Sequence, residues 1–321
     1  MSTGDDDGGP AARVAVVGGG VVGLTCALEL ARAGHPVRLV TADDVSTTTS
    51  AVAAALWFPY RAGPAEDVLR WAAGSLAMFT TLAADGAPGV SLRSGTVVHR
   101  TPEPDLEWVR AVRGTRPAEA GDLPPGAPGG LRCTVPVIDM GRYLPWLAGR
   151  CRAAGVEIVR CRIDRLTDVP GDVVVLAAGL WSGELAGDGA PVPVQGQVVR
   201  LANPGLRDWL LDEDNPAGLT YVVPRATDVV CGGTAVEGAT GIEPDPAVEA
   251  AILQRVRALV PALRDAAVTS RAVGLRPGRP TVRLDRTEMG GRPLICCYGH
   301  GGAGVTLSWG CAADVVRLAA V

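Results

Sequence analysis

The chain has 321 residues, which suits one large domain or two interleaved domains with a sizeable core. Hydrophobic residues make up 47%, charged residues 20%, and the formal net charge at pH 7 is −4, a balance typical of soluble globular proteins. Lysine is absent, which excludes a pyridoxal phosphate Schiff base, a lysine-dependent aldolase and a Walker A phosphate site.

The acidic, glycine-rich segment 1–12 predicts a disordered tail and lacks the features of a signal peptide. No apolar run approaches the ~20 residues that span a bilayer, and no basic patch interleaved with aromatic residues indicates nucleic acid binding. The eight cysteines show no C-x-x-C pairing with zinc spacing, and the adjacent Cys296 and Cys297 are expected as buried thiols. A cytoplasmic protein without a membrane segment is predicted.

Residues 13–43 predict a strand, a glycine turn, a helix and a second strand. The apolar, β-branched run Val14 to Val17 is typical of a buried strand. Helical periodicity follows and stops at Ala33-Gly34, and a second strand is expected from Val37 to Val40.

The glycines of this unit have the G-x-G-x-x-G spacing of dinucleotide-binding turns. Gly18 permits the tight turn, Gly20 lets the backbone approach a pyrophosphate, and Gly23 lets the helix pack closely on the strand. The helix N-terminus would direct free N–H groups at the phosphates, and Asp43 could accept hydrogen bonds from ribose hydroxyls. This unit alone does not separate NAD from FAD.

A cluster of hydroxyl side chains follows in the segment 47–50, and Ala53 to Ala55 would permit close approach of the backbone. Hydroxyl side chains followed by very small residues would suit the wall of a site that binds a pyrophosphate and a flat ring. A Ser/Thr loop that caps the next helix explains the same residues equally well.

Regular elements are predicted along the middle of the chain from periodicity and from Gly/Pro punctuation. They are a helix over 66–83, a strand pair over 89–100, loops over 101–132, a helix over 140–155 with Pro145 in its first turn, and a strand over 155–166. The segment 172–185 predicts a buried strand that runs into the tiny residues Ala178 and Gly179, where a parallel sheet would meet a ligand.

The later segments predict a second, more antiparallel layer. Strands are expected over 195–201 and 221–234, a loop or lid around 203–218, and a helix over 247–263 that Pro261 ends. The end of the chain repeats the strand–glycine–helix pattern, with a buried strand over 294–298, a glycine-rich turn over 299–304 and a helix from about Val305. A second helix N-terminus would therefore face a ligand.

Taken together, the chain resembles the D-amino-acid oxidase family of FAD-dependent flavoproteins from about Arg13 to Leu318. The residues that carry the resemblance are VVGGGVVGL (16–24), TTTSAVAAALWFPY (47–60), AAGLWSG (177–183), VGLRPGRPTVRLD (273–285) and YGHGGAGVTLSWG (298–310).

The resemblance implies the residues that hold the substrate. Arg276 would bind its carboxylate as a planar fork, with help from the hydroxyl of Tyr221. The backbone carbonyl of Gly302 would accept from the substrate amine. Phe58, Tyr60 and Ala217 would line the substrate pocket.

The same resemblance implies non-covalent binding of FAD. The expected cofactor-binding residues are Gly18, Gly20, Val21, Val22, Gly23, Asp43, Thr48, Thr49, Ser50, Ala53, Ala55, Leu56, Ile163, Ala178, Gly179, Gly301, Gly302, Ala303, Gly304, Val305 and Thr306. His300 is expected to be structural, and Arg271 and Arg279 likewise.

Three departures from the family pattern bear on the preference for the substrate side chain. Ala217 stands where relatives from eukaryotes have a second tyrosine, Phe58 stands where a glutamine is common, and the lid around 203–218 is short. The acidic stretch 212–214 would repel acidic substrates if it lies near the pocket, and it is otherwise a solvated turn.

The implied fold is α/β: a Rossmann-like FAD-binding domain interleaved with a mostly antiparallel α+β substrate-binding domain. Residues 13–60, 140–188 and 268–321 are predicted for the former, and residues 61–139 and 189–267 for the latter.

The implied function is oxidation of D-amino acids, with neutral or apolar side chains favoured, to 2-oxo acids, ammonia and hydrogen peroxide. Hydride would pass from Cα to N5 of FAD, and molecular oxygen would be the acceptor; a homodimer is possible. The alternatives are a related oxidase of glycine, sarcosine or D-aspartate, a flavin dehydrogenase with another acceptor, or a non-catalytic flavin- or nucleotide-binding module.

Overall fold

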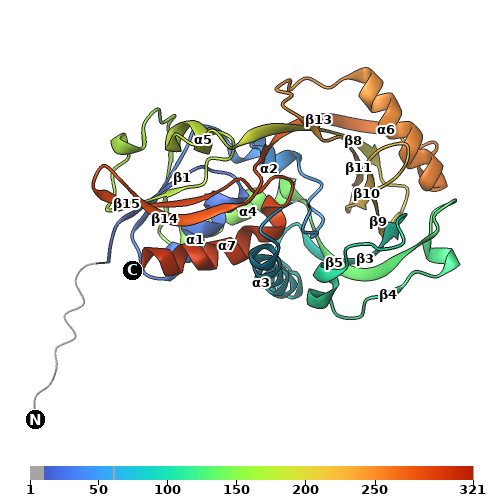
Figure 1. The fold of residues 1–321 in the computed structure, drawn as a ribbon, viewed down its shortest axis with the longest axis horizontal. Helices are drawn as coiled ribbons and strands as arrows, with labels where there is room; N and C mark the ends of the chain where they lie inside the picture. Colours follow the sequence, from blue (N-terminus) through green and yellow to red (C-terminus); the bar gives the residue numbers. More distant parts are fainter. Residues whose placement is uncertain (1–10, 61, 321) are drawn as a thin grey trace, which may run out of the picture.

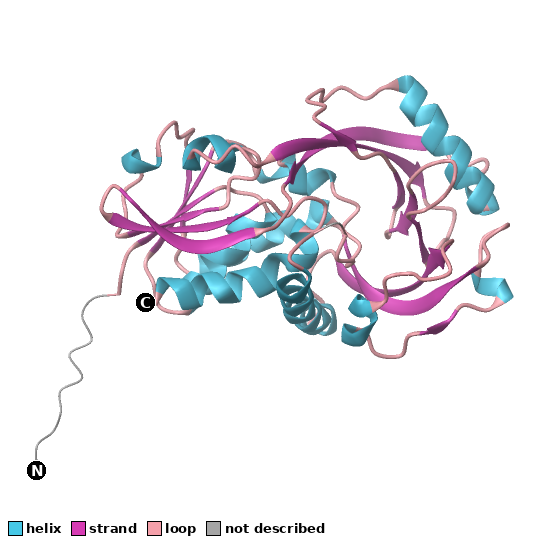
Figure 2. Ribbon diagram, in the orientation of Figure 1, coloured by secondary structure: helices cyan, strands magenta, loops and turns pink. Residues whose placement is uncertain are grey.

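The structure is a computed structural model that describes residues 11–60 and 62–320. The chain forms two lobes, each built on its own sheet (Figures 1 and 2). Most of the predicted tail, residues 1–10, lies outside the described residues. Within the described ranges, no helix is both long and apolar enough to cross a membrane.

The first sheet has six strands in the order β14-β15-β7-β1-β2-β6. All neighbours pair in parallel except β14 and β15, which are antiparallel. Its strands are β1 (Val14–Val17), β2 (Val37–Thr41), β6 (Glu157–Arg160), β7 (Val173–Leu176), β14 (Arg283–Met289) and β15 (Arg292–Tyr298).

The second sheet has nine strands and is antiparallel apart from the β3–β9 pair. Its strands are β3 (Val90–His99), β4 (Arg116–Pro117), β5 (Gly129–Ile138), β8 (Val192–Ala202), β9 (Trp209–Asp212), β10 (Thr220–Pro224), β11 (Asp228–Gly232), β12 (Val236–Glu237) and β13 (Val268–Gly278). The longest pairing joins β8 and β13, which run side by side from Val192 opposite Gly278 to Leu201 opposite Val268.

Helices cover the sheets. They are α1 (Val21–Arg32), α2 (Thr49–Val52), α3 (Ala65–Ala84), α4 (Met140–Ala153), α5 (Trp181–Ala186), α6 (Pro246–Leu259) and α7 (Gly304–Ala319). Figure 1 shows α1 and α7 on one face of the six-stranded sheet and α6 on the outside of the nine-stranded sheet. The predicted α/β architecture with a second, mostly antiparallel sheet is confirmed.

The strand β1 shows why a run of apolar residues is required in this sheet. Val14 and Val16 pack into one hydrophobic cluster, whereas Ala15 and Val17 pack into another on the opposite face. Successive side chains of a strand point to opposite faces, so a strand with both faces covered must be apolar throughout.

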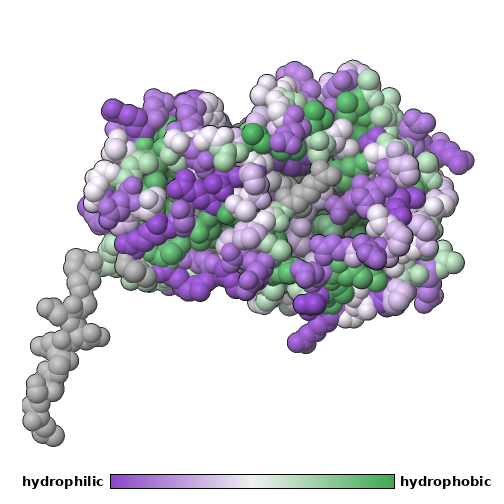
Figure 3. All heavy atoms as spheres, in the orientation of Figure 1, coloured by the Kyte–Doolittle hydropathy of each residue, from purple (hydrophilic) through white to green (hydrophobic). Residues whose placement is uncertain are grey.

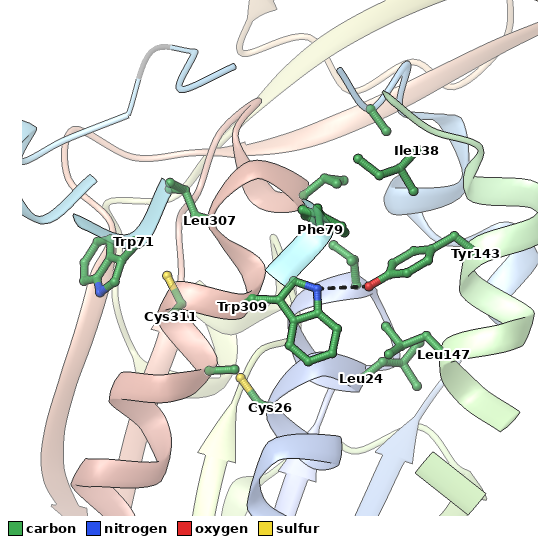
Figure 4. Close-up of a cluster of buried hydrophobic side chains, with 14 of the residues drawn as sticks. Leu24, Cys26, Trp71, Phe79, Ile138, Tyr143, Leu147, Leu307, Trp309 and Cys311 are labelled. Carbon is green, nitrogen blue, oxygen red and sulfur yellow. Dashed lines mark hydrogen bonds between the residues drawn. The ribbon is translucent and has the colours of Figure 1, made fainter. Parts of the chain in front are cut away.

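The main core lies between α1, α3, α4, α7 and the sheet (Figure 4). The indole N–H of Trp309 on α7 donates to the hydroxyl of Tyr143 on α4 over 3.1 Å, so these two buried polar groups are partners (Figure 4). Where α3 crosses α7, a Cβ at Gly310 would lie 2.2 Å from the carbonyl oxygen of Trp71, so only glycine permits this helix contact.

Several expectations about individual elements are wrong. Residues 89–100 form one long strand, β3, instead of a strand pair, and its partner β5 begins at Gly129, inside the segment predicted as loops. Pro145 lies in the second turn of α4, because the helix begins at Met140 and Asp139 caps it through Gly141 N–H.

The segment around 203–218 is not only a loop, since it contains the buried strand β9. Asp212, the first residue of the acidic stretch, is fully buried and forms a 2.6 Å ion pair with Arg100. It is therefore neither a solvated turn residue nor a wall of a pocket, and it holds β9 against the chain that follows β3.

The domain boundaries remain a prediction. Residues 268–278, which were assigned to the cofactor-binding domain, form β13 and pair with β8 in the nine-stranded sheet.

Figure 3 shows hydrophilic side chains over most of the visible face, with smaller hydrophobic patches among them.

Candidate functional site

A cavity of about 640 Å³ extends between the two sheets and is lined by residues from both. On the side of the six-stranded sheet, the lining residues follow directly after the carboxyl ends of β1, β2, β7 and β15. Ligands of parallel α/β sheets bind at this edge. We call the part near Asp43 the Asp43 end and the part near Arg276 the Arg276 end.

The turn between β1 and α1 forms the backbone wall of the Asp43 end. Gly18 has φ +120°, and a Cβ there would lie 2.2 Å from the carbonyl oxygen of Ala177. A Cβ at Gly23 would lie 1.9 Å from the Gly18 carbonyl oxygen, which confirms that the helix packs on the turn through this glycine. Gly20 lines the cavity, so backbone reaches the cavity surface there.

The N-terminus of α1 opens into this part of the cavity. Its N-cap, Gly20, has no side chain, and the hydroxyl of Ser50 accepts from the N–H of Val21 over 3.0 Å. Val22 also lines the cavity and belongs to the first helical turn, whose N–H groups have no partner within the helix. Free N–H groups and the helix dipole make this position suited to an anion such as a phosphate.

A second helix N-terminus, that of α7, meets the same cavity. The preceding loop is held to β13, because Gly301 N–H donates to the carbonyl of Pro277 over 2.9 Å. Gly304, Val305 and Thr306 form the first turn of α7 and line the cavity. The positive end of this helix dipole therefore faces whatever the cavity holds.

The segment 55–58 runs along the cavity wall between β5 and α7. Ala55 has φ +55°, and its carbonyl accepts from Ile138 N–H over 2.9 Å. The hydroxyl of Thr306 accepts from Phe58 N–H over 3.1 Å and donates to the Phe58 carbonyl over 3.0 Å. These bonds fix the segment at both ends, so it forms a rigid wall.

Arg276 and Tyr221 come together at the Arg276 end. A guanidinium N–H of Arg276 donates to the carbonyl of Thr234 over 2.9 Å, and the guanidinium lies flat over Gly196, where a Cβ would be 2.3 Å from Nη2. Burial raises the pKa of Tyr221, while the adjacent Arg276 opposes that shift. The hydroxyl thus stays protonated and can donate a hydrogen bond next to a cation.

Tyr60, Phe58 and Gly302 complete the Arg276 end. A Cβ at Gly302 would lie 2.6 Å from the Tyr60 ring and 3.7 Å from Cδ of Arg276, so the backbone of the glycine loop passes close to both. The Phe58 ring packs edge-on against Trp108, with the ring centroids 5.2 Å apart. The wall is therefore aromatic, with one cationic group.

The structure places most of the predicted site residues on the cavity wall. Those that line it are Gly18, Gly20, Val21, Val22, Asp43, Thr48, Thr49, Ser50, Ala53, Ala55, Leu56, Phe58, Tyr60, Ile163, Ala178, Gly179, Tyr221, Arg276, Gly301, Gly302, Gly304, Val305 and Thr306.

Three predicted residues are not among the lining residues. Gly23 and Ala303 support the wall from behind, the former against Gly18 and the latter fully buried. Ala217 is exposed in a turn that Asn215 caps, and Leu219 lines the cavity instead.

Arg162 and Trp181 are among the lining residues at the Asp43 end that the sequence analysis did not predict. The guanidinium of Arg162 lies 4.4 Å from the centroid of the half-exposed Trp181 ring. Trp181 is part of the AAGLWSG motif, and Arg162 directly precedes the predicted Ile163, so both positions lie next to residues that the sequence did single out.

The arginines expected to be structural have partners away from the cavity. Arg271 pairs with Glu249, and Arg279 lies 3.2 Å from Asp188. His300 is buried and lines the cavity, and burial lowers its pKa to about 4. It is therefore neutral at neutral pH, and its Nε2 lies 4.0 Å from the sulfur of Cys297.

Comparison with known proteins agrees with this geometry. The model of a family described as FAD dependent oxidoreductase matches residues 13–318. A D-amino-acid oxidase from Rubrobacter xylanophilus is 50% identical over 312 residues, which cover 96% of each chain. One from Streptomyces coelicolor is 44% identical over 312 residues, with the same coverage.

More distant relatives match nearly the whole length of the chain. A D-aspartate oxidase from Homo sapiens is 35% identical over 325 residues, covering 96% of this chain and 94% of its own. The solved structure of a glycine oxidase from Bacillus cereus matches with a TM-score of 0.80 at 22% identity, covering 96% of this chain and 95% of that one. At this identity the match shows a common fold.

Proposed function

The chain belongs to the family of FAD dependent oxidoreductases, and on that premise we propose that it oxidises D-amino acids with neutral, apolar side chains, using oxygen as the electron acceptor. FAD is its cofactor. The observation that carries the proposal is the pairing of Arg276 with Tyr221 at one end of a long cavity whose other end has the glycine turn and Asp43.

The cavity fits FAD in the chemistry of its donors. The Asp43 carboxylate would accept from the ribose hydroxyls of the nucleotide half, and the first turn of α1 would donate to the pyrophosphate. The hydroxyls of Thr48 and Thr49 donate to the carbonyls of Val45 and Leu275, which fixes this part of the cavity wall. The flat ring would lie against the segment 55–58 and the start of α7.

The substrate carboxylate would bind Arg276. The guanidinium already donates one N–H to a backbone carbonyl, which fixes its plane while leaving other N–H groups for a ligand. A planar fork forms two parallel, charge-assisted hydrogen bonds to a carboxylate. The protonated hydroxyl of Tyr221 would supply a third.

The amine and the side chain of the substrate, which are the other two heavy-atom substituents of its Cα, would contact different parts of the Arg276 end. The carbonyl of Gly302 would accept from the amine. Leu219 and Val223, two residues to either side of Tyr221, line the cavity together with Leu211, which lies opposite Tyr221 in the β9–β10 pair. These side chains would contact the side chain of the substrate. Three fixed points of contact distinguish enantiomers, so only one would present its Cα–H correctly.

When bound, FAD would supply the acceptor for a hydride from Cα of the substrate and would pass the electrons to oxygen, which would become hydrogen peroxide. The substrate that loses the hydride would become an imino acid, which water hydrolyses to a 2-oxo acid and ammonia. The chain itself supplies orientation and charge. The positive end of α7 would stabilise negative charge that develops beside it during the transfer.

The preference for neutral side chains rests on the charges of the wall. Among the described residues, the cationic side chains that line the cavity are Arg276 and Arg162, and the latter lies at the Asp43 end beside Trp181. A D-aspartate side chain would then be buried near Arg276 without a second cation, and burial of an unpaired charge is costly.

Peroxide release from the purified FAD-loaded protein tests the proposal directly. The panel contains D-alanine, D-valine, D-phenylalanine, D-aspartate, glycine, sarcosine and the L-enantiomers. We expect peroxide from the apolar D-amino acids, with kcat/KM higher than for D-aspartate and glycine, and none from the L-enantiomers. Highest kcat/KM for D-aspartate or glycine would contradict the substrate class, and turnover only with an artificial acceptor would contradict the role of oxygen.

A further inference from the structure

A group of metal-ligating side chains that the proposed reaction does not use lies beneath the loop after β15. Cys297 is the penultimate residue of β15, His300 follows in the loop, and Cys311 lies on α7. All three are buried, and their ligand atoms lie within 4.8 Å of one another.

The spacing of these atoms is close to that of a metal site. Cys297 Sγ lies 4.0 Å from His300 Nε2. Zinc bonds of about 2.3 Å to sulfur and 2.0–2.1 Å to nitrogen, in tetrahedral geometry, would place neighbouring ligand atoms roughly 3.5–3.8 Å apart. Small side-chain rotations would therefore bring the three atoms onto one ion.

Cys26, on α1, is a further buried thiol near Cys297, but its sulfur is not one of the atoms that lie within 4.8 Å of one another. Figure 4 shows Cys26 and Cys311 in the core between α1 and α7. Two sulfurs and one imidazole form a ligand set that zinc accepts, with the fourth position left for an exogenous ligand.

The imidazole would coordinate through Nε2, the ring nitrogen that lies 4.0 Å from the Cys297 sulfur. The thiols would each release a proton when the ion binds. Cys297 and His300 also line the cavity, so the ion would lie at its wall.

We propose that Cys297, His300 and Cys311 bind one thiophilic divalent ion, Zn²⁺ or Cd²⁺. The ion would join β15, the glycine loop and α7 at one point. It would stabilise the loop that carries Gly302 without taking part in electron transfer. Cysteine also fills cores as a small apolar residue, and that role alone requires no ion.

Cadmium retention by the purified, FAD-loaded full chain tests the proposal. The protein is incubated with Cd²⁺, freed of unbound metal on a desalting column, and measured for metal content and for thiolate-to-metal charge-transfer absorption. We expect one ion per chain, the absorption band, and a rise of the thermal unfolding midpoint by a few degrees, because a ligand that binds only the folded state stabilises it.

Variants identify the ligands. Cys297→Ala and Cys311→Ala should each lose the bound ion and the absorption band. Cys133→Ala, which removes a buried thiol in β5, should keep both. Cadmium NMR of the unaltered chain provides a measurement that does not depend on the folding of a variant, since its chemical shift separates sulfur–nitrogen from oxygen coordination.

Retention of no ion by the unaltered chain would overturn the proposal. So would retention that Cys297→Ala and Cys311→Ala leave unchanged, or that is lost with the exposed Cys161, or a cadmium shift typical of oxygen ligands. None of these outcomes bears on the proposed oxidase activity, which the peroxide panel measures separately.

Discussion

The Asp43 end of the cavity is walled largely by backbone, whereas the Arg276 end is walled by side chains. At the Asp43 end, three glycines and the first turn of α1 lie within one short stretch of sequence. At the Arg276 end, Phe58, Tyr221, Arg276 and Gly302 come from four separate stretches of sequence, two of which are strands of the nine-stranded sheet. A backbone turn recognises a phosphate common to many ligands, while convergent side chains recognise one substrate.

This difference predicts that substitutions can impair substrate binding and FAD binding independently. Changes at the Arg276 end should affect substrate constants and leave FAD affinity unaltered, and changes at the Asp43 end should do the reverse.

Arg276→Ala should have the largest effect. Loss of a charged hydrogen-bonding partner in a buried site costs about 2–5 kcal/mol, which corresponds to a fall in kcat/KM of roughly 30-fold to several thousand-fold, mainly through KM. Steady-state kinetics and a fluorescence titration of FAD measure the two constants. Arg271→Ala, on the same strand but paired with Glu249, is the control and should behave like the parent. A near-parental KM for Arg276→Ala would refute its role.

Gly23→Ala tests the opposite end. The added methyl would lie 1.9 Å from the Gly18 carbonyl oxygen, so α1 must move away from the turn, and overpacking of this kind costs about 1–3 kcal/mol. We expect weaker FAD binding and a lower unfolding temperature. In Gly149→Ala, a helical glycine of α4 with open space around it, stability should rise by about 1 kcal/mol. Parental FAD affinity in Gly23→Ala would show that the tight turn is dispensable.

Tyr221→Phe should weaken the Arg276 end less than the arginine variant does. A hydrogen bond to a charged group contributes about 1.5–3 kcal/mol, so KM should rise roughly tenfold to a hundredfold with an unchanged FAD affinity. A change confined to kcat would indicate that the hydroxyl acts in the transfer step and not in carboxylate binding.

Asp43→Asn should weaken FAD binding alone. The amide of asparagine keeps the shape of the carboxyl group but is an uncharged acceptor. The loss of binding free energy should be about 1 kcal/mol, which raises the dissociation constant of FAD several-fold. The KM for a D-amino acid at saturating FAD should not change. A rise in KM without a loss of FAD affinity would place Asp43 at the wrong end.

The smallest expected effect is one of pH. Burial raises the pKa of Tyr221 above its usual value of 10.0, so the hydroxyl keeps its proton and remains a donor throughout the neutral and mildly alkaline range. The ratio of KM between Tyr221→Phe and the parent should therefore stay constant from about pH 7 to about pH 10. A ratio that falls towards unity below pH 10 would mean that Tyr221 ionises earlier.

The same contrast explains what could be predicted from the sequence. The unit β1–α1–β2 was predicted with nearly correct bounds, because the turn, helix and strand follow from neighbouring residues. Gly18 and Gly23 have the close contacts that their spacing requires. Arg276 and Tyr221 became candidates only through resemblance, since no local pattern shows that two residues so far apart in sequence meet.

The errors have the same origin in long-range contacts. The strand β9 was not recognised because its last residue is an aspartate, which Arg100, far away in sequence, neutralises. Ala217 was assigned to the pocket by its position relative to Tyr221, but the turn capped by Asn215 points it to solvent. The approach of Arg162 to Trp181 likewise depends on how separate segments meet at the edge of the sheet.

The most direct test of the account is a crystal structure of the FAD-loaded protein with a small carboxylate that lacks an amine and cannot be oxidised. We expect both carboxylate oxygens within hydrogen-bond distance of the Arg276 guanidinium, one of them also near the Tyr221 hydroxyl, with FAD extending from there to Asp43. A carboxylate bound elsewhere, with Arg276 still bonded only to the Thr234 carbonyl, would contradict it.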